Sequence, residues 1–548
     1  TSSSKKVNQV WGAFVQQLME KPDLWLTAVQ EGQKKQIEIM TQQQTQPLVT
    51  PEKGDRRFNA DQWQQNPLFS MLMQNYLINS DVLRSLAEKM DMSEKDKKIL
   101  HFAVNQYIDA MSPTNFPATN PEVMEEAVKT GGESISQGMQ NFLQDVQSGS
   151  MVKNTDLSAF TIGENIATTP GKVILQTPLM QLIEYAPQTK QVHSRPLLIV
   201  PPCINKFYIL DLTEQKSMVA HLVAAGQRVF LVSWVNAGDE VCQATWDDYL
   251  RDGVMTAIEA VCNISKQDKI NTMGFCIGGT LLVSALAALA AGGEQPAKSV
   301  TLLATMLDFS DSGEIGLFVD EESVANREQQ FADGGLIDGR ELAKGFATLR
   351  PNDLIWPYVI GNYYQGKAPA AFDLLFWNAD STNLPGKMFA EYLRRTYLEN
   401  QITHGTAVMC GEAIEPKKIK AEVYNVACEK DHIVPWQTAY VSAQLLGKKH
   451  RFILSASGHI AGIVNPTDNK KGWHIQGDTS AADAESWRAS NEKHEGSWWS
   501  DWFAFLAKHG GKKVAAPKRV GNTRYGVIED APGSYVSKPR PLTANESN

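Results

Sequence analysis

The hydrophobic pattern of the chain changes near residue 165. Before that point, apolar residues recur at intervals of three and four, the spacing of one helix face, as in NPLFSMLMQNYLINSDVLRSLAEKM. After it, short apolar runs rich in β-branched residues alternate with helical stretches. We therefore expect a mainly helical N-terminal domain at residues 1–165 and an α/β domain at residues 166–548.

The first helical stretch carries a continuous apolar stripe, formed by Val7, Val10, Trp11, Phe14, Val15, Leu18 and Met19. Such a stripe can dock onto the protein's own core or lie on a partner or a lipid-like surface. We favour docking onto the protein's own core. Both interpretations assign the stripe to attachment and not to chemistry, and the glutamine-rich stretch that follows, TQQQTQPLVTPEKGDRR, resembles a linker.

The second part of the chain predicts a mostly parallel sheet with helices on both faces. Strand-like runs occur at residues 195–202, 227–235, 270–275, 299–309, 421–431 and 450–459, and helical stretches lie between the earlier ones. The interval at about 310–418 is rich in Trp, Phe and Tyr. We expect this interval to form a cap over the carboxyl edge of the sheet, where open α/β sheets bind their ligands.

Composition excludes several classes of protein. A chain of 548 residues exceeds the ~250–300 at which a single core stops growing, and its net charge of -9 provides no overall basic face for nucleic acid. The six cysteines contain no CxxC pair, so we expect neither disulfides nor a zinc site, and free thiols suit a reducing cytosol. We also expect no secretion signal and no membrane span, because every apolar run falls short of roughly 18 residues.

The stretch NTMGFCIGGT, residues 271–280, carries the candidate chemistry. Glycines frame Cys276 between a predicted strand and a predicted helix, which is the context of the nucleophile elbow in hydrolases, with cysteine in place of serine. A cysteine can also be a small buried hydrophobe. The strand-turn-helix context favours a nucleophile.

Two later strand ends supply candidate partners. In this fold the acid and then the histidine follow the nucleophile along the chain. Asp431 ends AEVYNVACEKD and His459 ends HRFILSASGH. Either residue alone would be an ordinary turn or surface residue, but their order predicts a triad of Cys276, Asp431 and His459.

Backbone groups complete the predicted site. The N–H of Ile277 is the expected oxyanion donor, and a second donor is expected in the loop near Cys203 and Ile204. The stretch GENIATTPGKV has Ile166 and Val173 where a phosphate loop needs Gly and Ser or Thr. Dinucleotide, zinc and EF-hand motifs are also missing from the sequence, so we predict no cofactor and no metal.

From about residue 58 onward, the chain resembles the polyhydroxyalkanoate synthases, most closely the single-chain class I type. The resemblance rests on an ordered set of motifs: GENIATTPGKVILQTPLMQLIEY, PPCINKFYILDL, SWVNAGDE, TWDDYL, GFCIGGT, MLDFSDSGEIG, WNADSTNLPG, EKDHIVPW and SGHIAGIVNP. It implies an α/β-hydrolase fold with a Cys276, Asp431 and His459 triad. It also implies that (R)-3-hydroxyacyl-coenzyme A thioesters, with short acyl units such as 3-hydroxybutyryl, are polymerised with release of coenzyme A.

The resemblance extends to partners and location. It implies a cytoplasmic homodimer at the surface of polyhydroxyalkanoate granules, bound to its growing polyester chain, with granule-associated proteins as further candidate partners. Coenzyme A would be part of the substrate and a product, not a cofactor. Asp431 would either orient His459 or help to activate the attacking hydroxyl.

Two other functions fit parts of the sequence. A cysteine hydrolase of the dienelactone type also has a GxCxGG elbow, but it is a compact single domain and leaves the helical domain and the cap unexplained. A non-catalytic protein that binds the polymer granule would account for the N-terminal stripe, but it would not need Cys, Asp and His in this order.

Overall fold

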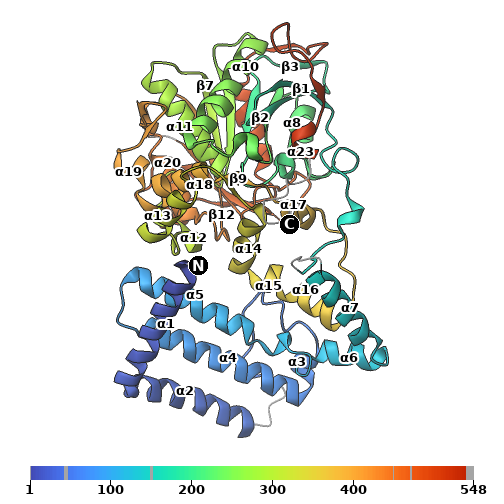
Figure 1. Ribbon diagram of the computed structural model, residues 1–548, viewed down its shortest axis with the longest axis vertical. Helices are drawn as coiled ribbons and strands as arrows, with labels where there is room; N and C mark the ends of the chain where they lie inside the picture. Colours follow the sequence, from blue (N-terminus) through green and yellow to red (C-terminus); the bar gives the residue numbers. More distant parts are fainter. Residues whose placement is uncertain (1, 42–46, 148–151, 448–449, 470–471, 538–548) are drawn as a thin grey trace. The chain divides into compact units, whose positions relative to one another are not determined.

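The computed structural model describes residues 2–41, 47–147, 152–447, 450–469 and 472–537. The chain forms two compact units (Figure 1). Unit 1 comprises Thr1–Leu157 and Lys344–Phe372, and unit 2 comprises Ser158–Ala343 and Asp373–Asn548. This division differs from the continuous ranges 1–165 and 166–548 expected from the sequence, because part of the expected cap packs in unit 1.

All regular secondary structure among the described residues of unit 1 is helical, as the periodicity before residue 165 predicts. Within it, α2 packs against α4, α4 against α5, and α5 against α1 (Figure 1). The N-terminal helices are α1 (Ser2–Glu20), α2 (Pro22–Thr41), α3 (Gln62–Gln65), α4 (Pro67–Glu88), α5 (Glu94–Ala110), η1 (Pro113–Asn115), α6 (Pro121–Lys129) and α7 (Glu133–Gln147). Each described helix is too short or too polar to cross a membrane.

The apolar stripe of α1 packs on the helices of unit 1. Val10 and Phe14 are buried, and the ring of Trp11 lies 6.0 Å from that of Tyr107 on α5. Met19, at the end of the stripe, is exposed. Docking onto the protein's own core is therefore the interpretation that agrees with the structure.

The segment 344–372 joins unit 1 through a close backbone contact. It contains the end of α14 (Gly339–Leu349), α15 (Pro351–Leu354), α16 (Trp356–Tyr358) and the π-helix η6 (Val359–Tyr364). A Cβ on Gly138 of α7 would lie 2.1 Å from the carbonyl oxygen of Tyr363, so only glycine allows α7 and η6 to approach this closely. The Tyr363 hydroxyl also donates to Asp145 at 2.9 Å.

Unit 2 is built on one large mixed sheet with the order β15-β14-β13-β12-β7-β6-β4-β5-β2-β1-β17. Its central strands β13, β12, β7, β6, β4 and β5 are parallel, as predicted, and the strands at both edges are antiparallel. The strands are β1 (Gly171–Gln176), β2 (Met180–Tyr185), β4 (Leu197–Val200), β5 (Val229–Trp234), β6 (Ile270–Phe275), β7 (Ala297–Leu303), β12 (Glu422–Cys428), β13 (Arg451–Ser455), β14 (Trp473–Asp478), β15 (Lys493–Glu495) and β17 (Glu529–Asp530).

Hydrophobic cores cover both faces of this sheet. Leu198 and Val200 of β4 belong to one buried cluster and Leu197 and Ile199 to another, because successive side chains of a strand point to opposite faces. The first cluster includes residues of α10 (Thr256–Ser265), α11 (Ile277–Ala291) and α20 (Trp436–Gln444). The second includes residues of α8 (Met218–Ala224) and α22 (Trp499–His509). This is the α/β architecture that the sequence predicts.

The remaining elements of unit 2 are short. Those between β7 and β12 are α12 (Gly313–Gly316), α13 (Glu321–Gln330), β8 (Leu336–Ile337), α17 (Asp373–Ala379), β9 (Leu384–Pro385), α18 (Gly386–Tyr392), η7 (Leu393–Leu398), α19 (Gln401–His404), β10 (Val408–Met409), β11 (Glu412–Ala413) and η8 (Pro416–Lys418). The others are η2 (Leu157–Ala159), β3 (Gln191–His193), η3 (Phe207–Asp211), η4 (Asp239–Val241), α9 (Trp246–Asp248), η5 (Tyr249–Met255), α21 (Ala484–Ser490), β16 (Lys513–Ala515) and α23 (Ser534–Ser537).

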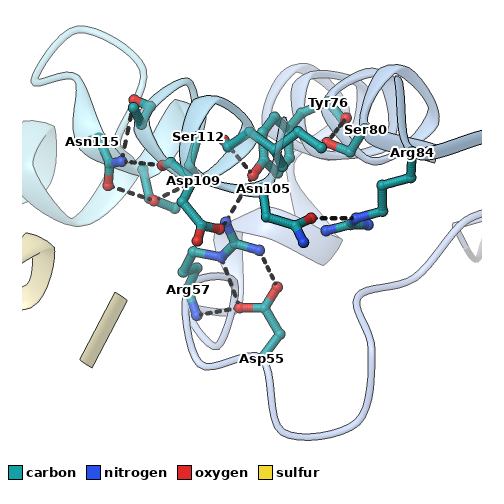
Figure 2. Close-up of polar contacts among 12 residues, drawn as sticks. Asp55, Arg57, Tyr76, Ser80, Arg84, Asn105, Asp109, Ser112 and Asn115 are labelled. Atoms are coloured by element: carbon teal, nitrogen blue, oxygen red, sulfur yellow. Dashed lines mark hydrogen bonds and ion pairs between the residues drawn. The ribbon is translucent and has the colours of Figure 1, made fainter. Parts of the chain in front are cut away.

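A largely buried arginine connects the loop before α3 to two helices of unit 1 (Figure 2). Arg57 pairs with Asp55 at 2.9 Å and with Asp109 at 3.3 Å, and it donates to the Tyr76 hydroxyl at 2.7 Å. Tyr76 lies on α4 and Asp109 on α5. The guanidinium is therefore shared by three segments, and its loss would leave two carboxylates without their cation.

We expect Arg57→Met to destabilise unit 1 by about 3 kcal/mol, the typical cost of leaving a buried charge unpaired. Hydrogen exchange of the α4 and α5 amides measures this loss locally. The neighbouring Arg56 is exposed, so Arg56→Met is the matched control and should change exchange little. Equal effects of the two substitutions would contradict the assigned role.

Candidate active site

The predicted elbow is a single strained residue. Cys276 lies between the end of β6 and the start of α11, with φ 52° and ψ -129°. A non-glycine residue at positive φ costs on the order of 1–3 kcal/mol, which the surrounding structure must offset. The Cys276 N–H donates to the Leu303 carbonyl at 2.9 Å, and its carbonyl accepts from the Gly279 N–H at 2.8 Å.

Three glycines make this turn possible because the backbones around it nearly touch. A Cβ on Gly274 would lie 2.4 Å from the Cα of Gly279, and one on Gly278 would lie 2.3 Å from the carbonyl oxygen of Val200. A Cβ on Gly279 would lie 2.1 Å from Oγ1 of Thr305. The first turn of α11 is thus in contact with the ends of β4 and β6, as the elbow interpretation predicts.

The structure brings the predicted acid and histidine together. Nδ1 of His459 lies 2.6 Å from Oδ2 of Asp431, and the other oxygen of Asp431 accepts the N–H groups of Ile433 and Val434, each at 2.9 Å. Cys276 lies close enough to His459 to affect the pKa of its imidazole. All three residues predicted from the sequence therefore lie at one site.

Burial and two neighbouring side chains act on the pKa of His459. Burial of His459 disfavours its charged form. Its pKa is nevertheless raised well above the ordinary value, because the charges of Asp431 and Cys276 and their hydrogen bonds favour the imidazolium. The ring of Phe275 stacks on His459 with the ring centroids 5.6 Å apart and limits its tilt. This arrangement can accept a proton at Nε2 and stabilise the resulting charge.

Candidate oxyanion donors occur at both predicted positions. Ile277 is the first residue of α11, where backbone N–H groups have no partner within the helix. The loop after β4 carries Cys203 and Ile204, and the indole of Trp234 fixes its start by donating to the Pro201 carbonyl at 2.9 Å. Cys203 lies near the elbow: burial raises the pKa of its thiol, and the negative charge of Cys276 adds to the increase.

Sequence reasoning missed an aromatic group beside the elbow. The ring centroids of Tyr392 and Tyr397 lie 5.6 Å apart, and Trp246 stacks on Tyr392 with ring centroids 5.3 Å apart. Burial raises the pKa of both hydroxyls, and the negative charge of Cys276 raises it further. The elbow therefore faces aromatic side chains from the segment after β7.

A second acid lies near the end of β7 but has a different environment. Asp308 accepts from the Ser310 N–H at 2.9 Å and from the Asn400 side-chain amide at 2.8 Å, and Asn400 accepts from the Phe309 N–H at 3.0 Å. Burial favours its neutral form, but these hydrogen bonds lower the pKa of Asp308. Asp308 therefore connects the β7 loop to the segment near α19, whereas His459 is paired with Asp431.

Among the described residues, we find no group of three or more His, Cys, Asp or Glu side chains arranged to hold a metal ion.

Two family models match the chain. The model for the poly-beta-hydroxybutyrate polymerase (PhaC) N-terminus matches residues 54–222, and the model for the alpha/beta hydrolase fold matches residues 196–466. The second match covers β4 to the loop after His459 and confirms the predicted fold. Among solved structures, the chain is similar to a monoacylglycerol lipase of Paleococcus ferrophilus, with TM-score 0.33 and 14% identity over 51% of this chain and 88% of that chain.

Curated relatives cover most of the chain. It is 48% identical over 488 residues to the poly(3-hydroxyalkanoate) polymerase subunit PhaC of Cupriavidus necator, which covers 88% of this chain and 83% of that protein. It is 40% identical to the subunit of the same name from Rhizobium etli, over 88% of this chain and 76% of that protein. The resemblance predicted from the motifs is thereby confirmed, and the chain belongs to the poly(3-hydroxyalkanoate) polymerase family, enzymes of the acyl-transferring polymerase kind on an α/β-hydrolase fold.

Proposed function

We propose that this enzyme polymerises (R)-3-hydroxyacyl-coenzyme A thioesters with short acyl units into a polyhydroxyalkanoate and releases coenzyme A. The observation that carries the proposal is the grouping of Cys276, His459 and Asp431, in which a thiol at a strained elbow lies near an imidazole whose Nδ1 is held by a carboxylate. Family membership supports the polyester product.

The first step moves the acyl group from coenzyme A to the enzyme. His459 takes the proton of Cys276, and the sulfur attacks the thioester carbonyl. The bond between the carbonyl carbon and the coenzyme A sulfur breaks, and the leaving sulfur takes the proton from His459. One thioester replaces another, so the acyl group stays activated.

The second step forms the polyester bond. The hydroxyl of another unit gives its proton to His459 and attacks the Cys276 thioester, a general-base step typically worth ~10²–10⁴-fold. An oxygen ester forms, the bond to the Cys276 sulfur breaks, and the thiolate regains a proton. Each carbonyl oxygen that becomes negative would be stabilised by the N–H of Ile277 and by one from the loop near Cys203 and Ile204.

This sequence of steps explains why sulfur stands at the elbow. Exchange between thioesters is nearly balanced in free energy, whereas transfer to a hydroxyl is downhill because oxygen esters are more resonance-stabilised. A serine would spend that driving force in the first step and hold the acyl group as a stable ester. The proposed chemistry uses only groups of this chain, and coenzyme A enters as part of the substrate and leaves as a product.

The contacts of Asp431 support an orienting role. One carboxylate oxygen is occupied by two backbone N–H groups and the other by Nδ1 of His459. This geometry fixes the tautomer in which Nε2 faces Cys276 and stabilises the imidazolium once it forms. Direct activation of the attacking hydroxyl by Asp431 would require that hydroxyl to reach the remaining lone pair of Oδ2, beside Nδ1 of His459.

We further propose that the enzyme works in the cytoplasm at the surface of polyhydroxyalkanoate granules, as a homodimer. Each addition to an incoming acyl-coenzyme A unit leaves the lengthened chain as a coenzyme A thioester, which re-acylates Cys276 by the first step, so the enzyme remains at the surface of its insoluble product. Exposed apolar side chains on α6 and α7, including Val128, Ile135 and Met139, support contact with such a surface. Granule-associated proteins would meet the enzyme there.

One experiment separates this function from the two alternatives. Purified enzyme is supplied with 3-hydroxybutyryl-coenzyme A, and released coenzyme A and polymer are both measured. A polymerase releases coenzyme A in proportion to polymer, a hydrolase releases it with free hydroxy acid, and a non-catalytic binding protein releases none.

We expect Cys276→Ala to lower polymer formation at least about a thousandfold while the protein stays folded, because the covalent route is lost. Cys276→Ser should also be severely impaired. Coenzyme A release and polymer mass measure the effect. Cys262→Ala, on the half-buried thiol of α10, is the matched control and should retain activity. Normal synthesis by soluble Cys276→Ala enzyme would refute the nucleophile.

We expect Asp431→Asn to retain part of the acylation burst but to lose elongation, because a thiol attacking a thioester needs less base than a hydroxyl does. Rapid-quench measurement of the coenzyme A burst and of steady turnover separates the phases. Asp268→Asn, on an exposed aspartate, should leave both phases intact. Equal loss of both phases would count against a special role in elongation.

We expect His459→Gln to lower the thermal midpoint of unfolding more at pH 6 than at pH 9. The folded-state pKa of His459 is raised, so its stabilisation is complete below the unfolded value of about 6.5 and is lost as pH rises through the folded pKa. Scanning calorimetry of wild type and variant at both pH values measures the difference. In an Asp431→Asn background this difference should shrink, and a difference that grows with pH would overturn the assigned charge state.

A further inference from the structure

A buried lysine lies close behind the loop that carries the second candidate oxyanion donor. Lys206 follows Cys203 and Ile204 by a few residues, and only 6% of its side chain is exposed. A buried ammonium is costly unless it is paired and fully hydrogen-bonded. The partners of the Lys206 ammonium therefore show which parts of unit 2 hold this loop.

The first partner comes from the segment after α17. Nζ of Lys206 lies 2.9 Å from Oδ1 of Asp380, whose other oxygen accepts from the Tyr208 hydroxyl at 2.9 Å. The backbone of the loop is held as well: the Trp377 indole donates to the Lys206 carbonyl at 2.8 Å, and Asn205 forms a β-bridge with Ser381. The loop after β4 is thus attached to the segment 377–381 at successive residues.

The second partner comes from the C-terminal part of the chain. Nζ of Lys206 donates to the Val536 carbonyl at 2.9 Å. Val536 is buried in the same hydrophobic cluster as Tyr208 and Trp377, and Cys276 packs against that cluster. One ammonium therefore joins the loop after β4, the segment around Asp380 and α23.

The C-terminal segment is itself anchored to the sheet. β17 pairs with β1, the Tyr535 N–H donates to the Gln181 side chain at 3.2 Å, and the Tyr535 hydroxyl donates to the Thr177 carbonyl at 2.7 Å. Gln181 lies on β2, which pairs with β5 next to β4. Residues 529–537 thus form a strap from the edge of the sheet to Lys206.

The loop and the elbow are in direct contact. A Cβ on Gly278 would lie 2.5 Å from the Pro201 carbonyl oxygen, so the loop begins against the first turn of α11. A shift of the loop would move the backbone near Cys203 relative to Cys276. Displacement of an oriented group by about 1 Å can cost about a hundredfold in rate.

We propose that Lys206 is a positioning residue, which makes acyl transfer at Cys276 depend on the docked C-terminal strap, residues 529–537, through its joint contacts with Asp380 and Val536. The inference rests on the proposed function, since it assigns the loop near Cys203 and Ile204 to the stabilisation of the acyl-transfer oxyanion. It also gives the C-terminal segment a role in catalysis that does not require it to touch the substrate.

The test compares two lysines in the full-length enzyme. Lys206→Met should lower kcat by about tenfold or more and change KM by less than about twofold, because the loop acts on the transition state and not on substrate binding. Lys216→Met is the matched control: Lys216 pairs with Asp373 of α17 at 2.7 Å, but it lies beyond the loop. The kcat of Lys216→Met should stay within about twofold of wild type even where its thermal midpoint falls as much as that of Lys206→Met.

Hydrogen exchange tests the coupling itself. In Lys206→Met, exchange should quicken at the amides of 533–537 and of 203–206 together, and in Lys216→Met at neither. Asp380→Asn keeps the size of the side chain but removes its charge, and it should reproduce both the lower kcat and the faster exchange. This variant decides the question if Lys206→Met does not fold.

Three outcomes overturn the inference: equal loss of kcat in the two lysine variants, unchanged kcat in Lys206→Met, or a lower kcat with unchanged exchange at 533–537. Failure of the proposed function looks different. A wild-type enzyme that releases coenzyme A without making polymer would refute polymerisation, while the exchange measurements would still show whether Lys206 couples the strap to the loop.

Discussion

The positive φ of Cys276 is the constraint on which the rest of the site depends. The residue can keep this conformation only if α11 starts immediately after β6 and packs against the ends of β4 and β6. This packing leaves no room for a side chain at Gly274, Gly278 or Gly279. A Cβ added at any of them would lie within 2.4 Å of a neighbouring atom. The surrounding sheet offsets the strain. The strained conformation holds the thiol outside the backbone of the turn.

The parallel register of the sheet then determines which other residues can reach the thiol. β12 and β13 pair in parallel with Cys428 opposite Ser455, so the loops that follow them leave the sheet at the same edge. Asp431 follows the first strand and His459 the second, which brings together residues that are separate in the sequence. The grouping of Cys276, His459 and Asp431 therefore depends on strand pairing as much as on the residues themselves.

Sequence reasoning succeeded where a local pattern reports a local structure. The β-branched runs predicted the central strands, and the glycines around Cys276 predicted the elbow. It missed the pairing of β1 and β2 at the sheet edge, where polar residues such as Gln181 and Glu184 are buried and break the usual pattern. It also assigned residues 344–372 to the cap. The contact between Gly138 and Tyr363 that places them in unit 1 joins segments far apart in the sequence, and no local pattern reports it.

The aromatic group beside the elbow shows a different limit of prediction from sequence. Residues five apart on an α-helix point roughly 140° away from each other, so Tyr392 and Tyr397 do not form a stripe at helical spacing. The structure has a π-helix at Leu393–Leu398, and the extra residue in that turn brings the two rings together. The propensities and periods used to interpret a sequence assume regular helices.

Asp308 and Asp431 show that hydrogen-bond donors, and not residue type, decide what a carboxylate does. Both are buried acids after parallel strands, and either could serve a histidine on sequence position alone. Oδ1 of Asp308 accepts from Ser310 and from the side chain of Asn400, which ties the β7 loop to the chain near α19. Asp431 gives one oxygen to its own turn and keeps the other for His459. What distinguishes the two acids is the partner of the second oxygen: Oδ2 of Asp431 meets Nδ1 of His459, because the loops after β12 and β13 leave the sheet at the same edge.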